Sequence, residues 1–140
     1  MCKGAKILVV DDDQDLVLGI SIRLQANHYQ VCSAFGVQDA IETAQREKPD
    51  LIILDITFPI GNGILLIPRL RLIESLEDVP VLVMTGKSPS FLRDEAITMG
   101  AQAFLRKPMD NDELLTTVRR ILQRNGRASC PEPQQSPAPG

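Results

Sequence analysis

Residues 6–13 have the sequence Lys-Ile-Leu-Val-Val-Asp-Asp-Asp, a short apolar run that ends in three carboxylates. Residues 51–55, Leu-Ile-Ile-Leu-Asp, repeat the same pattern. Continuous apolar runs of this length are typical of central parallel strands, which helices cover on both faces. In such sheets functional groups gather at the carboxyl ends of the strands. The sequence therefore predicts a parallel sheet with a cluster of acidic side chains at one edge.

The chain from Ala5 to about Gly126 alternates short β-rich runs with longer helical segments. This alternation predicts an α/β fold, a doubly wound five-stranded parallel sheet between layers of helices. The predicted strands are Lys6–Val10, Gln30–Ser33, Leu51–Leu54, Val81–Met84 and Ala103–Leu105.

Amphipathic segments between the strands predict five helices. Asp13 is a suitable N-cap for the first helix, whose apolar face is expected to include Leu16, Ile20 and Leu24. Ser88 before Pro89 suits the start of the fourth helix, and Gly100 its end. The predicted helices are Gln14–Ala26, Val37–Glu47, a third one after Gly61-Asn62-Gly63, about Pro89–Met99 and about Asn111–Arg124.

The third predicted helix contains Pro68. Proline lacks a backbone donor and crowds the preceding helical turn, but it is tolerated in the first turn. We therefore expect this helix to start late or to be kinked.

Length, charge and cysteine content exclude several classes of protein. The chain has 140 residues, which is the length of one ordinary domain. Its net charge of −3 provides no positive electrostatic field that would attract nucleic acid. No apolar run approaches the roughly 20 residues that span a bilayer. No secretory signal precedes Asp11, so we expect a cytoplasmic protein. Cys2, Cys32 and Cys130 lack paired spacing and are expected to be reduced thiols.

The composition changes after Arg124. Residues 125–140 contain four prolines and no periodic apolar residues, so they cannot bury enough surface to become ordered. We expect a folded domain at residues 5–125 and a disordered, proline-rich tail or the start of a linker at residues 126–140. On this interpretation we expect the chain to be the front part of a longer protein, the alternative being a complete protein of one domain.

Polar groups converge at the carboxyl ends of the predicted strands. Asp11 and Asp12 follow the first strand, and Asp55 ends the third. Neighbouring carboxylates repel one another and favour a bound cation, and an all-oxygen site suits Mg²⁺ better than Zn²⁺. Thr85 and Lys107 add a hydroxyl and an ammonium group at the ends of the fourth and fifth strands. Such a set suits phosphoryl transfer, with the carboxylate of Asp55 as the nucleophile.

Four stretches of sequence carry these residues, in order along the chain. They are Ile7–Asp13, Asp50–Asp55 with Pro59 and Gly63 beyond it, Val81–Gly86 and Gly100–Pro108. In residue types and spacing they resemble the receiver domain of two-component response regulators, over residues 5 to about 125. The resemblance implies a flavodoxin-like, CheY-like sheet with strand order 2-1-3-4-5.

The resemblance also implies a phosphorylation site. Asp55 corresponds to the phosphoacceptor. Asp11 and Asp12 correspond to the acidic pair that holds Mg²⁺, with Asp12 as the direct ligand. The backbone carbonyl of Thr57 corresponds to a further metal ligand, beside the carboxylate of Asp55.

Further residues correspond to the family's switch. Thr85 matches the hydroxyl that moves to bond the phosphoryl oxygen, and Lys107 matches the lysine that pairs with it. Phe104 matches the aromatic position whose rotamer changes on activation.

The resemblance implies that the chain is a signalling switch and not an enzyme that acts on other molecules. It would take a phosphoryl group from the phosphohistidine of a sensor histidine kinase or phosphotransfer protein, and would catalyse only its own phosphorylation and dephosphorylation. Its response would appear on the surface of the fourth helix, fifth strand and fifth helix, which would control an output domain or partner protein and could form a homodimer. No direct contact of this domain with nucleic acid or membrane is expected.

Three other functions fit these residues less well. A haloacid-dehalogenase-type phosphatase needs a second aspartate two residues after the nucleophile, where this chain has Thr57. A flavin-binding flavodoxin-like domain needs a phosphate-binding loop after the first strand, where Asp11–Asp13 would repel phosphate. A receiver-like interaction module that no longer takes phosphate is the remaining alternative.

Overall fold

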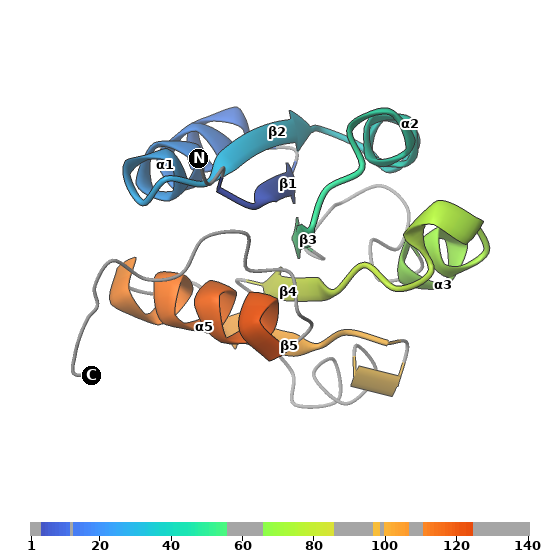
Figure 1. The fold of residues 1–140 in the computed structure, drawn as a ribbon. Helices are drawn as coiled ribbons and strands as arrows, with labels where there is room; N and C mark the ends of the chain where they lie inside the picture. The colour runs from blue at the N-terminus through green and yellow to red at the C-terminus, as the bar shows by residue number, and fades with distance from the viewer. Residues whose placement is uncertain are drawn as a thin grey trace.

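Five parallel strands form one sheet in the computed structural model, which describes residues 4–11, 13–55, 66–85, 97–98, 100–106 and 111–124. The order across the sheet is β2-β1-β3-β4-β5, and every neighbouring pair is parallel (Figure 1). This arrangement confirms the predicted fold and strand order. The strands are Lys6–Val10 (β1), Gln30–Ala34 (β2), Leu51–Asp55 (β3), Val81–Thr85 (β4) and Ala103–Arg106 (β5).

Three of the predicted helices have the bounds expected from the sequence: Gln14–Ala26 (α1), Val37–Glu47 (α2) and Asn111–Arg124 (α5). The third helix covers Leu66–Arg71 (α3), followed by a short 3₁₀ helix at Glu74–Leu76 (η2). Within the described ranges, none of the helices has both the length and the apolarity needed to cross a bilayer.

Several predictions for local structure fall on residues outside the described ranges. Pro68 lies in α3, but the residues before Leu66, which decide whether the helix starts late, are outside those ranges. Of the fourth predicted helix only residues 97–98 are described, and both are helical. The predicted tail at residues 126–140 lies outside as well.

Alternation of side chains along the strands divides the core into two layers. Leu8 and Val10 of β1 pack in one cluster with side chains of α2 and α3. Ile7 and Val9 pack in the other cluster, with α1 and α5. Figure 1 shows α1 and α5 on one side of the sheet and α2 and α3 on the other. A central parallel strand is buried on both faces in this way, which explains its continuous apolar sequence.

The buried face of α1 differs slightly from its prediction. Ile20 and Leu24 are buried as expected, but the third fully buried residue is Val17. Leu16, predicted to be in the stripe, is partly buried at the margin of the same cluster. The spacing i, i+3, i+7 of Val17, Ile20 and Leu24 also places them on one helical face, and the position of the helix on the sheet selects this stripe.

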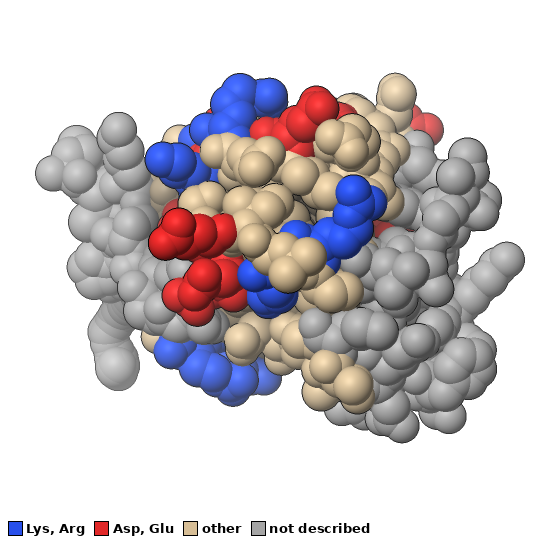
Figure 2. All heavy atoms as spheres, turned by 90° about the vertical axis from the view of Figure 1, so that its right-hand side faces the viewer, with Lys and Arg blue, Asp and Glu red and all other residues tan. Residues whose placement is uncertain are grey.

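Charges of both signs are mixed on the described part of the face shown in Figure 2. One pair on the surface of the molecule joins Lys6 Nζ to Glu47 Oε1 at 3.0 Å, and Arg46 Nε lies 3.3 Å from Glu47 Oε2. Hydrogen bonds from Lys6 and Arg46 lower the pKa of the Glu47 carboxyl. Exposed ion pairs of this kind contribute little to stability, so the fold depends mainly on its apolar layers.

Cys32 is a free, half-buried thiol on β2. Its Sγ atom lies 3.8 Å from the carbonyl oxygen of Ile7. Burial, with a smaller contribution from Glu47, raises the pKa of the Cys32 thiol from its usual value of 9.0 to about 11. The thiol is therefore neutral at physiological pH and a poor nucleophile.

We expect Cys32 to react slowly with iodoacetamide in the folded protein. At pH 9 the raised pKa makes its thiolate fraction roughly 50-fold lower than in the unfolded chain, and the rate should keep increasing as the pH rises towards 11. Peptide mapping by mass spectrometry, with and without urea, measures this rate. Equal rates in the folded and unfolded chain at pH 9 would contradict the burial effect.

Replacing a side chain in the centre of the sheet should destabilise the fold strongly. Ile53 is fully buried between β1 and β4, so Ile53→Ala should lower the free energy of unfolding by about 2–5 kcal/mol. The control Leu72→Ala, at a side chain that is 87% exposed, should change it by less than about 0.5 kcal/mol. Urea denaturation followed by circular dichroism distinguishes the two, and equal effects would disprove the assignment of the core.

Candidate functional site

Two buried carboxylates stand at the carboxyl ends of neighbouring strands. β1 pairs with β3 so that Val10 is opposite Leu54. Asp11 and Asp55 are the residues that follow this pair in the two segments. Adjacent strands are about 4.8 Å apart. Asp11 is fully buried and Asp55 is 2% exposed. The structure therefore brings together two of the predicted site residues at the expected edge of the sheet.

Backbone hydrogen bonds fix the position of Asp11. Its N–H donates to the carbonyl oxygen of Ala34 at the end of β2, at 3.1 Å. Its Oδ1 accepts a hydrogen bond from the N–H of Asp13 at 3.0 Å. The position of the first carboxylate thus depends on β2 as well as on β1.

Asp13 is the N-cap of α1, as predicted, and not a member of the carboxylate pair. Its Oδ1 accepts from the N–H groups of Asp15 and Leu16, at 3.0 and 3.2 Å. Capping satisfies donors that the first helical turn leaves without partners. The N-cap is therefore fixed two residues after Asp11, and α1 begins at the next residue, Gln14.

Thr85 is the last residue of β4, one residue beyond the position that is in register with Asp55. Met84 is in register with Asp55, and Thr85 is in register with Arg106 of β5. The structure describes the backbone of Thr85 here. Three further predicted site residues, Asp12, Thr57 and Lys107, lie outside the described residues.

The donor atoms at this edge fit a magnesium ion. The carboxylate oxygens of Asp11 and Asp55 are hard ligands of the kind that Mg²⁺ prefers. Two carboxylates buried side by side are also stabilised by a nearby cation. Within the part of the chain that is described, no group of three or more His, Cys, Asp or Glu could hold a metal ion. Two of the four predicted ligands, Asp12 and Thr57, are outside that part.

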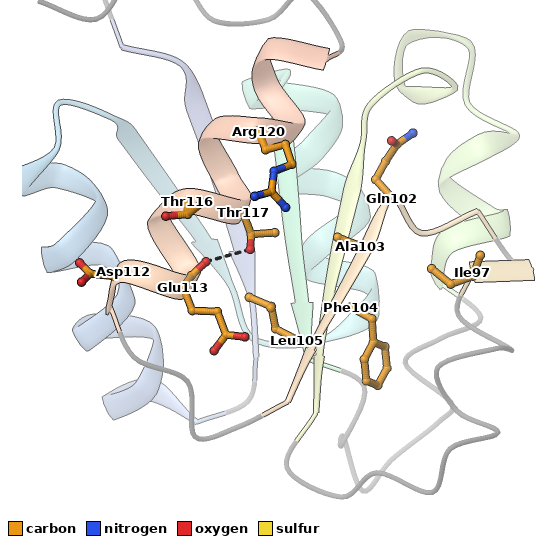
Figure 3. Close-up of a pocket in the computed structure, with 10 residues that line it drawn as sticks. All are labelled: Ile97, Gln102, Ala103, Phe104, Leu105, Asp112, Glu113, Thr116, Thr117 and Arg120. Atoms are coloured by element: carbon orange, nitrogen blue, oxygen red, sulfur yellow. Dashed lines mark hydrogen bonds between the residues drawn. The ribbon is translucent and has the colours of Figure 1, made fainter. Parts of the chain in front are cut away.

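Phe104 lies at a second feature, a groove of about 690 Å³ beside β5. The half-buried ring also packs against the cluster that contains α2 and α3. Figure 3 shows the groove residues coming from β5 and the residue before it, from α5 and from the helical residues 97–98. They are Ile97, Gln102, Ala103, Phe104, Leu105, Asp112, Glu113, Thr116, Thr117 and Arg120.

Most of the polar residues that line this groove were not singled out from the sequence. Glu113, Thr116, Thr117 and Arg120 follow the spacing i, i+3, i+4, i+7, which places them on one face of α5. This polar stripe was the available signal. The hydroxyl of Thr117 donates to the carbonyl oxygen of Glu113 at 2.8 Å, within the helix itself.

Comparisons with known proteins agree with this geometry. The profile of the response regulator receiver domain matches residues 7–119. The transcriptional regulatory protein PrrA of Mycobacterium tuberculosis is 33% identical over 121 residues, which cover 86% of this chain and 51% of PrrA. The alkaline phosphatase synthesis transcriptional regulatory protein PhoP of Bacillus subtilis is 34% identical over 120 residues, covering 86% and 49%. The chain thus spans about half the length of these curated relatives.

A solved structure gives the same result for the fold. The chemotaxis protein CheY4 of Vibrio cholerae superposes with a TM-score of 0.80 at 30% sequence identity. The match covers 85% of this chain and 99% of CheY4. With its β2-β1-β3-β4-β5 sheet and its acidic edge, the chain belongs to the response regulator receiver domain family of two-component signalling systems.

Proposed function

We propose that the chain is a phosphorylation-controlled switch that accepts a phosphoryl group on Asp55. The observation that supports this most is the position of Asp55, buried at the end of β3 beside Asp11 in a chain of the receiver family. A carboxylate in this position has a second acidic group next to it for binding a cation. The proposed folded unit is residues 5–125.

The proposed reaction is a transfer between two side chains. A carboxylate oxygen of Asp55 attacks the phosphorus of a phosphohistidine on a sensor histidine kinase or phosphotransfer protein. An O–P bond forms while the P–N bond breaks, and the imidazole leaves. Hydrolysis of the resulting acyl phosphate by water returns the free carboxylate and releases inorganic phosphate. The protein would thus catalyse only its own phosphorylation and dephosphorylation.

The remaining site residues would hold and neutralise the phosphoryl group. Asp11, Asp12, Asp55 and the carbonyl of Thr57 would bind Mg²⁺, which supplies positive charge against the phosphoryl oxygens. Lys107 would contribute an ammonium group to the same oxygens. Positioning and charge neutralisation are the main requirements of phosphoryl transfer, and these residue types provide both.

Phosphorylation would then change the groove around Phe104. The phosphoryl group adds nearly two negative charges and strong acceptor oxygens, to which the hydroxyl of Thr85 would move. The ring of Phe104 would fill the space left by that hydroxyl and alter the surface formed by β5, α5 and the end of the fourth helix. This surface is the proposed contact for an output domain, a partner protein or a second copy of the chain.

Labelling with a small phosphodonor tests the acceptor. With Mg²⁺ and acetyl phosphate, intact-mass measurement should show one added phosphoryl group on the wild-type chain and on Glu77→Gln, a control at an exposed carboxylate. Asp55→Asn should show none, because an amide cannot act as the nucleophile. Labelling of Asp55→Asn to the same extent would disprove the assignment of Asp55 as the acceptor. A wild-type chain that takes no label would favour the alternative function, a receiver-like interaction module that no longer takes phosphate.

Beryllofluoride, which mimics the phosphoryl group, tests the conformational switch. In the presence of Mg²⁺ it should shift the backbone amide resonances of Thr85 and Phe104, because the change at Asp55 is expected to reach β5. Two-dimensional NMR of the wild-type chain measures this, with Asp55→Asn as the control. Shifts confined to the neighbourhood of Asp12 and Asp55 would show that binding occurs without a switch.

A further inference from the structure

Arg71, the last residue of α3, joins three separate segments through one side chain. Its Nη1 donates to two carbonyl oxygens that precede β4, that of Val79 at 2.6 Å and that of Leu76 at 3.2 Å. Its Nη2 donates to the carbonyl oxygen of Gly100 at 3.4 Å, shortly before β5. The planar guanidinium can reach all three because its donors diverge from one rigid group. One side chain therefore connects α3 to the segments that enter β4 and β5.

These contacts lie at the amino-terminal edge of the sheet. β4 and β5 are parallel, with Leu82 in register with Ala103, so the segments that enter the two strands arrive side by side. Asp11 and Asp55 lie at the opposite, carboxyl edge. The contacts of Arg71 therefore concern the entrance to β4 and β5 and not the acidic edge.

The Arg71 guanidinium is partly shielded from water. Burial lowers its pKa, while the nearby Asp78 raises it. The group remains charged, because arginine is not deprotonated in proteins. Hydrogen bonds from a charged donor are stronger than those between neutral groups. Removing the donor would leave the carbonyl oxygen of Val79, a buried residue, without this partner.

The turn at Gly100, here called the Gly100 turn, lies between Ile97 and Gln102 and packs closely on α3. Gly100 has a positive φ of 113°, a conformation that residues with a Cβ rarely adopt. A Cβ at this position would lie 3.5 Å from the side chain of Ile67 and 3.7 Å from Nε of Arg71. The N–H of Gly100 donates to the carbonyl oxygen of Ile97 at 3.0 Å. The close approach and the hydrogen bond from Arg71 both hold this turn against α3.

The Gly100 turn carries one wall of the groove. Ile97 and Gln102, which flank the turn, both line the groove, and Figure 3 shows them on the side away from α5. The N–H of Gln102 donates to the carbonyl oxygen of Val81 at 2.8 Å. Gln102 is thus attached directly to the start of β4, and through Gly100 and Arg71 to α3. Arg71 is not among the groove residues, so the position of this wall depends on a contact made outside the groove.

We propose that Arg71 is a positioning residue for the groove: its guanidinium fixes the Gly100 turn and thereby places Ile97 and Gln102 on the wall opposite α5. The effect concerns the shape of the groove in the unphosphorylated chain and needs no signal from Asp55. Its consequence for partner binding rests on the proposed function, which assigns the groove to a contact surface. A partner would then bind a surface whose shape depends on a residue that the partner does not touch.

The test compares substitutions at two arginines of α3, all in the unphosphorylated chain. Arg71→Met keeps an unbranched apolar stem but removes the donors, and Arg71→Lys keeps the charge but cannot reach three carbonyl groups at once. Arg69→Met is the matched control, because Arg69 is exposed on the same helix. Urea denaturation gives the global stability of each variant.

Amide hydrogen exchange, followed by NMR, shows whether Arg71 acts locally. The reporters are the N–H groups of Gly100 and Gln102, and the references are those of Asp11 and Gln30, which bond to backbone carbonyls on the β1–β2 side of the sheet. A general loss of stability raises the exchange of all amides that open by global unfolding by the same factor, whereas a local opening raises only the reporters. Residual dipolar couplings of the same amides measure the orientation of each N–H relative to the sheet, which a general loss of stability does not change.

In Arg71→Met, exchange at Gly100 and Gln102 should increase by about tenfold more than exchange at the two references. The dipolar couplings of the two reporters should depart from their wild-type values, while those of β1 and β3 should keep them. Arg71→Lys should show the same effects in weaker form, and Arg69→Met should behave like the wild-type chain. Labelling of Asp55 by acetyl phosphate should stay within about twofold of wild type, because Arg71 lies at the opposite edge of the sheet.

Two results would overturn the role of Arg71 in the groove. One is an equal change in exchange at reporters and references, or no change, with dipolar couplings as in the wild-type chain. The other is loss of the folded state in both Arg71 variants, which would show that the residue supports the whole domain. If the wild-type chain takes no label at Asp55, the proposed function fails, but exchange and dipolar couplings still decide the role of Arg71 because they need no phosphorylation.

Discussion

The parallel pairing of β1 with β3 is the constraint on which the rest of the structure depends. With Val10 opposite Leu54, the two strands end level with each other and present Asp11 and Asp55 side by side. A slip of one residue would turn every side chain of β1 to the opposite face and separate the carboxylates. Two apolar layers prevent that slip, because each face of the strand is already matched to its own helices. Packing of the core therefore determines the geometry of the acidic edge.

Burying carboxylates is unfavourable, and the surrounding fold has to compensate for it. Asp11 accepts a hydrogen bond from the backbone of Asp13, whose own side chain caps α1. The acidic edge is thus attached to the start of a helix that packs on the sheet through Val17, Ile20 and Leu24. A group held in this way responds to a change of charge more than an exposed carboxylate would, because water screens it less. This sensitivity would suit the phosphorylation-driven switch that we propose for the chain.

The groove and the acidic edge belong to different parts of the same sheet. Phe104 connects them through β5, which lies beside β4, the strand that pairs with β3. Arg71 joins the end of α3 to the segments that precede β4 and β5, through the carbonyl oxygens of Val79 and Gly100. The close-packed sheet between the groove and the acidic edge transmits displacement well, because it contains little free volume to absorb it.

The sequence alone determined the strands, the cap at Asp13 and the acidic positions Asp11 and Asp55, because each follows from a local pattern. The order of the strands across the sheet followed from the resemblance of the motifs to receiver domains. Only the tertiary structure decided which stripe of α1 is buried, since Leu16 and Val17 are both apolar and the position of the helix on the sheet selects between them. The groove and the contacts of Arg71 were also beyond the sequence. They join residues far apart in the chain, such as Arg71 and Gly100, and no local pattern encodes which carbonyl groups a long side chain will reach once the helices have packed.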